Sequence, residues 1–190
     1  MGDGGMQEAG PAAFEMGARV GFDGLELDLA ADYEGTLLWS AEGRQKLHDI
    51  IGAPGIELAS FCAGVCWTYS PASADPAVRG RIRDMLVAAC GYCVEFGVKW
   101  ILVPVTPGGE GVTHETGTQR WIEMMAEIAP VAADHGVALC LENVGRGYGK
   151  SAAELLNMAD AVASPGPTVH HDVGNALAFG NHPVEDIKLR

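Results

Sequence analysis

Short apolar segments recur along the chain, and longer stretches with helical spacing separate them. We predict strands at residues 22–29, 56–62, 99–105, 137–142 and 168–172, and helices at residues 11–19, 40–51, 76–96, 118–135 and from 151 onward. A further helix is expected to begin at His182. No hairpin signal joins any two of the strands, so the alternation of strand and helix predicts one parallel sheet.

The number of strands favours an α/β fold of the (β/α)8 TIM-barrel type that is incomplete. A closed eight-stranded barrel takes about 250 residues, whereas this chain has 190 residues and five predicted strands. We expect residues 1–190 to form one partial domain and residues 1–8 to be disordered, because they carry no periodic signal. An open five-stranded sheet of the flavodoxin type is the alternative that length alone permits.

Capping residues mark several helix boundaries. Asp75 followed by proline is a strong helix start, and Gly97 is a typical stop. Ser151 and the glutamate three residues later form a capping-box pattern. Thr118 is expected to cap the fourth helix, which leaves His114 in the preceding loop.

Two of the predicted strands carry acidic side chains on the face that would line the barrel. The segment with Leu25, Leu27 and Leu29 places leucines on one side and Glu26 and Asp28 on the other, because side chains alternate between the faces of a strand.

In the fourth strand the same count puts Cys140 on the face of Glu142, and Leu139 and Leu141 toward the helices. Asp172 follows the neighbouring strand, with His170 and Thr168 on its face. Since parallel strands collect ligands at their carboxyl ends, we expect Glu26, Glu142 and Asp172 to converge on one cleft.

The motifs Leu141-Glu142-Asn143 and Asp172-Val173-Gly174-Asn175 resemble those of the xylose-isomerase-like barrel superfamily, and the likeness extends from about residue 21 to the end of the chain. The resemblance implies that Glu142 and Asp172 bind a divalent metal and that Asn175 lies beside the substrate. Mn²⁺ is the expected ion, with Mg²⁺, Co²⁺ or Zn²⁺ as alternatives. A histidine and a second glutamate from the last two strands complete the family's site. The chain ends before them and also lacks the family's first strand.

Other residues near the strand ends are candidates for substrate binding. Glu26, Cys66, Trp67 and Arg146 are expected to contact the substrate. Aromatic residues such as Trp67 either cover the barrel mouth or stack against a sugar. Arg146 lies among glycines, where it is either a substrate contact or an exposed charge.

Composition and charge narrow the possible partners. The chain has 12 basic and 25 acidic residues, a net charge of −13, which opposes binding to nucleic acids and anionic membranes. No apolar run approaches the roughly 18 residues of a membrane helix, and no secretory signal is present, so we expect a soluble, cytoplasmic protein. Cys90 and Cys93 match a C-x-x-C pattern inside a predicted helix and are expected to be buried reduced thiols, and an odd number of five cysteines argues against a complete disulfide framework.

The leading functional hypothesis is a metal-dependent isomerase or epimerase that acts on a sugar or sugar phosphate through an enediolate. In this hypothesis Glu142 is also the base that removes the proton. The alternatives are an inosose-type dehydratase and an incomplete barrel without activity. An activity like that of endonuclease IV is disfavoured, because that enzyme needs several zinc-binding histidines.

Two open sheet edges also predict a homo-oligomer or poor stability.

Overall fold

The computed structural model describes residues 6–30, 37–52 and 55–189. The strands are β1 (Gly24–Asp28), β2 (Glu57–Cys62), β3 (Trp100–Pro104), β4 (Ala138–Glu142) and β5 (Pro167–His170). The helices are α1 (Met6–Val20), α2 (Ala41–Gly52), α3 (Pro76–Phe96), α4 (His114–Asp134), α5 (Ala152–Ala161), α6 (Val173–Ala178) and α7 (Pro183–Ile187). Two short 3₁₀ helices, η2 (Leu37–Trp39) and η3 (Gly64–Trp67), follow β1 and β2.

The strands form one sheet in the order β1-β2-β3-β4-β5, and every neighbouring pair is parallel. This sequential order is that of a barrel wall, so the prediction of an incomplete TIM barrel is confirmed. The flavodoxin-type alternative is wrong, because that fold exchanges the order of its first two strands.

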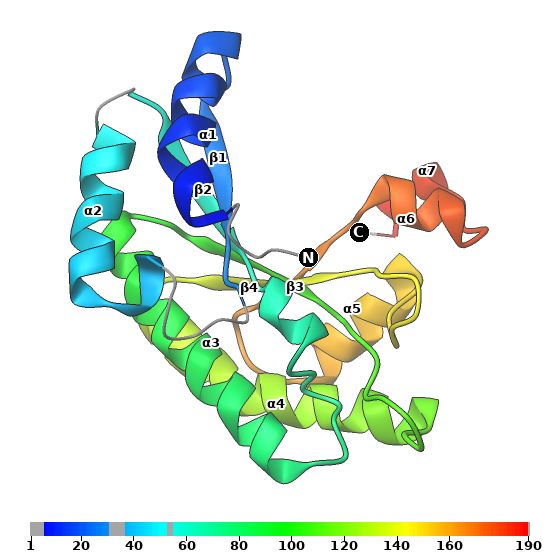
Figure 1. The fold of residues 1–190 in the computed structure, drawn as a ribbon. Coiled ribbons are helices and arrows are strands. Elements are labelled where there is room, and N and C mark those ends of the chain that lie inside the picture. Colours follow the sequence, from blue (N-terminus) through cyan, green and yellow to red (C-terminus); the bar gives the residue numbers. More distant parts are fainter. Residues whose placement is uncertain (1–5, 31–36, 53–54, 190) are drawn as a thin grey trace.

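The hydrophobic core lies between the outer face of the sheet and the helices α3, α4 and α5, which Figure 1 shows together on one side. Leu139 and Leu141 of β4 have no exposed surface, and neither do Ile101 and Val103 of β3. The inner face of β4 is less completely covered, since Cys140 is 9% exposed. The predicted alternation of outward leucines with Cys140 and Glu142 is therefore confirmed.

Helix α3 begins and ends where its capping signals predicted. The side chain of Asp75 accepts a hydrogen bond from the backbone of Ala77, and Gly97 adopts the left-handed conformation with φ of 70°. The capping box of α5 is also formed, because the Ser151 hydroxyl and the Glu154 carboxylate each bind the other's backbone N–H.

The predicted start of α4 is wrong. The helix begins at His114, and Thr113 is its N-cap, accepting a hydrogen bond from Thr116 N at 3.2 Å. Thr118 lies inside the helix. Gly117 also lies inside the helix, where a Cβ atom would overlap the ring of Tyr148.

The ends of the chain also differ from expectation. Helix α1 begins at Met6, within the segment expected to be disordered, while residues 1–5 lie outside the described residues. Strand β5 ends at His170, two residues before Asp172, and Asp172 caps the unpredicted helix α6. Helix α7 begins directly after His182, as predicted.

The cysteines are free thiols, as expected, and both Cys90 and Cys93 are buried in α3. None of the helices in the described part of the chain is long and apolar enough to cross a membrane.

Candidate active site at the carboxyl ends of the strands

An irregularity in β2 places polar side chains of β1 and β2 on the same inner face. Leu25 pairs with Leu58, but Glu26 pairs with Ser60, so Ala59 is an extra, bulged residue. The Ser60 hydroxyl donates to Glu26 Oε2 at 2.6 Å. The bulge thus fixes the Glu26 carboxylate on the inner face.

Asp28 ends β1 on the same face. Its Oδ1 accepts a hydrogen bond from Gly64 N at 3.0 Å, where η3 begins. A Cβ atom at position 64 would overlap this carboxyl group, so glycine is required for the contact. Desolvation raises the pKa of Asp28, the Gly64 amide lowers it, and the charge of Glu26 raises it further.

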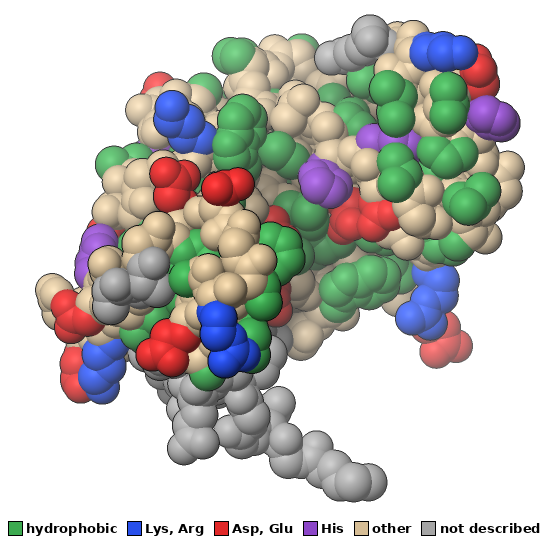
Figure 2. All heavy atoms as spheres, turned by 90° about the horizontal axis from the view of Figure 1, so that it is seen from above, with side chains coloured by type: hydrophobic (Ala, Val, Ile, Leu, Met, Phe, Trp, Pro, Cys, Tyr) green, Lys and Arg blue, Asp and Glu red, His purple; other side chains and the backbone are tan. Residues whose placement is uncertain are grey.

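A cavity of about 460 Å³ lies against the inner face of the sheet. Its lining includes Glu26, Ser60, Leu102, Cys140, Thr168 and His170, which come from all five strands. Glu142 pairs with His170 and lies on the same face of β4 as Cys140, and both of these residues line the cavity. Seen from above, a hollow bordered by acidic and apolar side chains separates the two sides of the molecule (Figure 2).

Asp172 is close enough to Glu142 to influence the titration of its carboxyl group. Burial, together with the charges of Asp172 and Glu26 and the hydrogen bond to Asp172, raises the pKa of Glu142 to about 7. Each of these contributions acts against the ionised form of Glu142. The charges of Glu26 and Asp172 both act on Glu142, and the convergence of the three carboxylates on one cleft stays a prediction.

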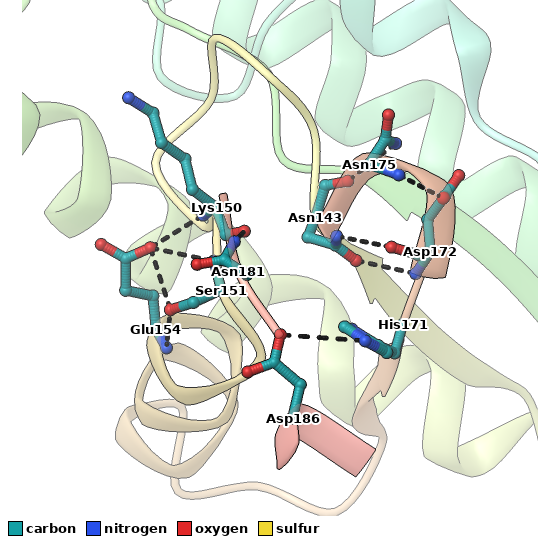
Figure 3. A network of polar contacts seen from close by, with 9 residues as sticks. All are labelled: Asn143, Lys150, Ser151, Glu154, His171, Asp172, Asn175, Asn181 and Asp186. Carbon is teal, nitrogen blue, oxygen red and sulfur yellow. Dashed lines mark hydrogen bonds and ion pairs between the residues drawn. The ribbon is translucent and has the colours of Figure 1, made fainter. Parts of the chain in front are cut away.

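Asn143 joins the two strand ends that carry these carboxylates (Figure 3). Its side chain accepts a hydrogen bond from Asp172 N at 2.8 Å and donates one to Asp172 O at 2.9 Å. Its own backbone oxygen accepts from Asn175 Nδ2 at 3.0 Å. Asn143 has no exposed surface.

The loops after β2, β3 and β4 are locked together by buried polar contacts. The Thr106 hydroxyl donates to Cys66 O at 2.8 Å, and Trp121 Nε1 donates to Thr106 O at 2.9 Å. The Tyr148 hydroxyl accepts from Gly108 N at 2.8 Å. These contacts fix the backbone around the barrel mouth.

The predicted substrate residues have different surroundings. Cys66 belongs to η3 and is fully buried, so the structure does not bring it to the cavity. Burial also raises the pKa of its thiol. Trp67 is 49% exposed on the same short helix. Arg146 is exposed, and no polar partner of its guanidinium is found in the described part of the chain. Asn175 uses its side-chain nitrogen to bind Asn143.

The carboxylate pair fits the divalent metal that the resemblance implies. Glu142 and Asp172 offer oxygen donors, which suit Mn²⁺ and Mg²⁺, and a cation between them would offset the repulsion that raises the pKa of Glu142. Within residues 6–30, 37–52 and 55–189, however, no three His, Cys, Asp or Glu side chains form a metal-binding group. In this part of the chain Glu142 and Asp172 are therefore candidate ligands only.

Asn143 is the site residue that the sequence reasoning did not single out. An asparagine directly after a strand is a weak signal for it, because a side-chain amide can take the place of a backbone peptide group. Its partner at Asp172 is 29 residues away in the sequence, so the pairing emerges only in the fold.

The Xylose isomerase-like TIM barrel family matches residues 14–190 of the chain. A protein of Escherichia coli (strain K12) named as a candidate L-ribulose-5-phosphate 3-epimerase is 29% identical over 185 residues, which are 94% of this chain and 63% of that protein. An L-ribulose-5-phosphate 3-epimerase of the same organism is 25% identical over 170 residues, 88% of this chain and 60% of that protein. The chain thus spans about 60% of the length of these relatives.

Solved structures with the same fold include sugar epimerases. A D-psicose 3-epimerase crystallised in the presence of D-fructose superposes with a TM-score of 0.76 at 20% identity, covering 94% of this chain and 63% of that one. A 3-keto-D-glucoside 4-epimerase from E. coli has a TM-score of 0.78 at 16% identity, covering 98% and 72%. Together with the family match over residues 14–190, the sequential parallel sheet shows that the chain belongs to the xylose isomerase-like TIM barrel family.

Proposed function

We propose that this chain carries part of the active site of a divalent-metal-dependent 3-epimerase that acts on a ketose or ketose phosphate. The observation that carries the proposal is the pair of carboxylates Glu142 and Asp172, held together at the carboxyl ends of neighbouring parallel strands. The names of the sequence relatives support a ketose phosphate as substrate, and D-psicose 3-epimerase among the structural neighbours supports a free ketose.

Glu142 is the proposed base. Epimerisation next to a ketone requires removal of a proton from carbon and its return to the opposite face. Glu142 would remove the proton on one face, and the proton returned to the opposite face has to come from a second group, for which the resemblance implies the second glutamate of the family's site. When bound, a divalent cation supplies positive charge beside the substrate oxygens, where negative charge develops as the proton leaves.

Asp172 would hold the cation together with Glu142, and its two oxygens have different tasks. Oδ1 accepts a hydrogen bond from Asn175 N at 2.7 Å, which leaves Oδ2 for the ion. Asn175 donates with its side-chain nitrogen to Asn143, so its amide oxygen can accept from a substrate hydroxyl. Glu26, Trp67 and Arg146 remain proposed substrate contacts. We leave out Cys66 because it is buried.

Deuterium exchange tests the proposal. The chain would be incubated with Mn²⁺ in D₂O with L-ribulose 5-phosphate or D-psicose, and proton NMR would follow the hydrogen at C3. We expect slow loss of the C3 proton and formation of the C3 epimer, and no exchange with Glu142→Gln, because an amide cannot accept the proton. Exchange that is equally fast in Glu142→Gln would contradict the proposal, and loss of water from the sugar would instead indicate a dehydratase.

A further inference from the structure

The backbone ladder between β4 and β5 stops before it reaches the second carboxylate. The last paired residues are Glu142 and His170. Two residues later Asp172 is the N-cap of α6, with φ of −78° and ψ of 108°, and the chain leaves the sheet. Strand pairing therefore does not hold Asp172 in place, and another contact has to do so.

The side chain of Asn143 provides that contact. It binds both backbone polar groups of Asp172, with its oxygen 2.8 Å from Asp172 N and its nitrogen 2.9 Å from Asp172 O. A pair of bonds of this kind needs a donor and an acceptor on one short side chain, which is the pattern of a primary amide. A carboxylate in its ionised form lacks the donor, and a hydroxyl group has a single oxygen for both tasks.

Asn175 closes the arrangement into a ring. It donates with Nδ2 to Asn143 O at 3.0 Å and with its backbone N to Asp172 Oδ1 at 2.7 Å. Figure 3 shows Asn143, Asp172 and Asn175 facing one another across the ends of the two strands. Because Asn143 has no exposed surface, water cannot readily replace these bonds.

We propose that Asn143 is the positioning residue that fixes Asp172 beside Glu142, so that the two carboxylates form one cation site; this inference rests on the proposed function. Two ionised carboxylates repel each other, so a restraint on the backbone helps to keep them together when no cation is bound. Asn143 is that restraint: it follows Glu142 directly in the chain and binds the backbone of Asp172. It touches neither the proposed ion nor the substrate.

The test compares Asn143→Ala with Asn181→Ala. Asn181 is a matched control, since its side chain donates to Lys150 O at 2.7 Å and also links the segment after β5 to the loop after β4, without contact to Asp172. Binding of Mn²⁺ would be measured by electron paramagnetic resonance of the free ion, at a temperature where circular dichroism shows all variants folded. We expect Asn143→Ala to weaken binding about 10- to 100-fold, the usual effect of losing a residue that orients a ligand, and Asn181→Ala to leave it unchanged.

Asn143→Asp separates positioning from packing. It keeps the size of the side chain and the acceptor for Asp172 N, but its carboxylate cannot donate to Asp172 O. A purely structural residue would be rescued by this near-isosteric change, and any added electrostatic attraction would favour the ion. We expect Asp172 to be displaced and Mn²⁺ binding to stay weak. Wild-type affinity in Asn143→Ala or Asn143→Asp would overturn the inference.

A measurement without metal distinguishes failure of this inference from failure of the proposed function. Hydrogen exchange of the Asp172 amide, followed by NMR, should accelerate in Asn143→Ala and stay at the wild-type rate in Asn181→Ala. An unchanged rate in Asn143→Ala would overturn the positioning role. If the rate accelerates but neither wild type nor Glu142→Gln binds Mn²⁺, Asn143 still positions Asp172 and the proposed function is what fails.

Discussion

The loops after β2, β3 and β4 differ sharply from the segment after β5 in how they are held. Thr106 and Tyr148, at 1% and 5% exposure, bind across the first group of loops from within the protein. In the segment after β5, the side chains of Leu177 and Ile187 are 69% and 61% exposed. Glu142 ends a strand in the tightly packed part, whereas Asp172 begins the loosely packed part. The proposed site therefore lies at the boundary between a rigid and a weakly held region.

Individual polar contacts attach the weakly held segment to the rest. Asn143 holds Asp172, Asn181 binds Lys150 O, and His171 lies 3.8 Å from Asp186 of α7 (Figure 3). The side-chain nitrogens of His171 are buried and have no hydrogen-bond partner among the residues that the structure describes. Such contacts orient the segment, but each contributes only about 1 kcal/mol to the free energy of unfolding.

The largest effect is expected where the tightly packed loops meet α4. A methyl group in Gly117→Ala would overlap the Tyr148 ring, so we expect the free energy of unfolding to fall by about 1–3 kcal/mol. In Gly91→Ala, in α3, the new methyl group meets no described atom within 4 Å. The free energy of unfolding should therefore rise by about 0.5–1 kcal/mol. Urea unfolding of both variants measures this. If Gly117→Ala were as stable as Gly91→Ala, the packing of Tyr148 on α4 would not exist in solution.

A smaller effect is expected at the boundary itself, as a dependence of stability on pH without metal. The folded chain raises the pKa of Glu142 from about 4.5 to about 7, so it binds a proton more tightly than the unfolded chain does. Stability should therefore be greatest below pH 4.5 as far as this group is concerned, and fall as the pH rises toward 7. Glu142→Gln should reduce this slope. Part of the slope should remain, because Asp28 also has a raised pKa.

Urea midpoints between pH 4.5 and 8 in the presence of a chelator would measure that slope, with Glu57→Gln as a control. Glu57 is exposed at the start of β2, at the opposite end of the sheet. A wild-type slope in Glu142→Gln would mean that burial beside Asp172 does not govern the titration of Glu142.

The smallest effect is expected in the weakly held segment. Leu177→Ser removes an exposed apolar side chain of α6, so the free energy of unfolding should change by less than about 0.5 kcal/mol. Sedimentation would show whether self-association decreases, since exposed apolar groups favour association. A loss of stability well above that value would show that α6 is packed in solution and would remove the contrast between the two regions.

Local signals in the sequence predicted most of the fold. The alternation of Leu139, Cys140 and Leu141 indicated which face of β4 is buried, and Asp75 and Gly97 marked both ends of α3. These signals depend on neighbours in the chain, which a sequence displays directly. The likeness of the Glu142 and Asp172 motifs to a known family supplied the candidate site.

Contacts between distant residues could not be predicted in this way. The contact of Gly117 with Tyr148 joins residues 31 positions apart, and no local pattern indicates it. Asn143 belongs to the motif that carries the family resemblance, but its bonds to Asp172 become visible only in the fold. Cys66 was expected at the mouth because it follows a strand closely, but the turn of η3 directs its side chain into the core.

The bulge at Ala59 accommodates one residue of β2 that has no partner in β1. Because side chains alternate, one extra residue keeps Leu58 and Phe61 on the core side while Ser60 meets Glu26. A substitution at Ala59 preserves the bulge, whereas loss of the residue would remove it and leave Leu58, Ser60 and Phe61 opposite Leu25, Glu26 and Leu27. In an alignment of relatives, a one-residue gap at this position would therefore indicate a regular strand with the same residues facing the barrel interior.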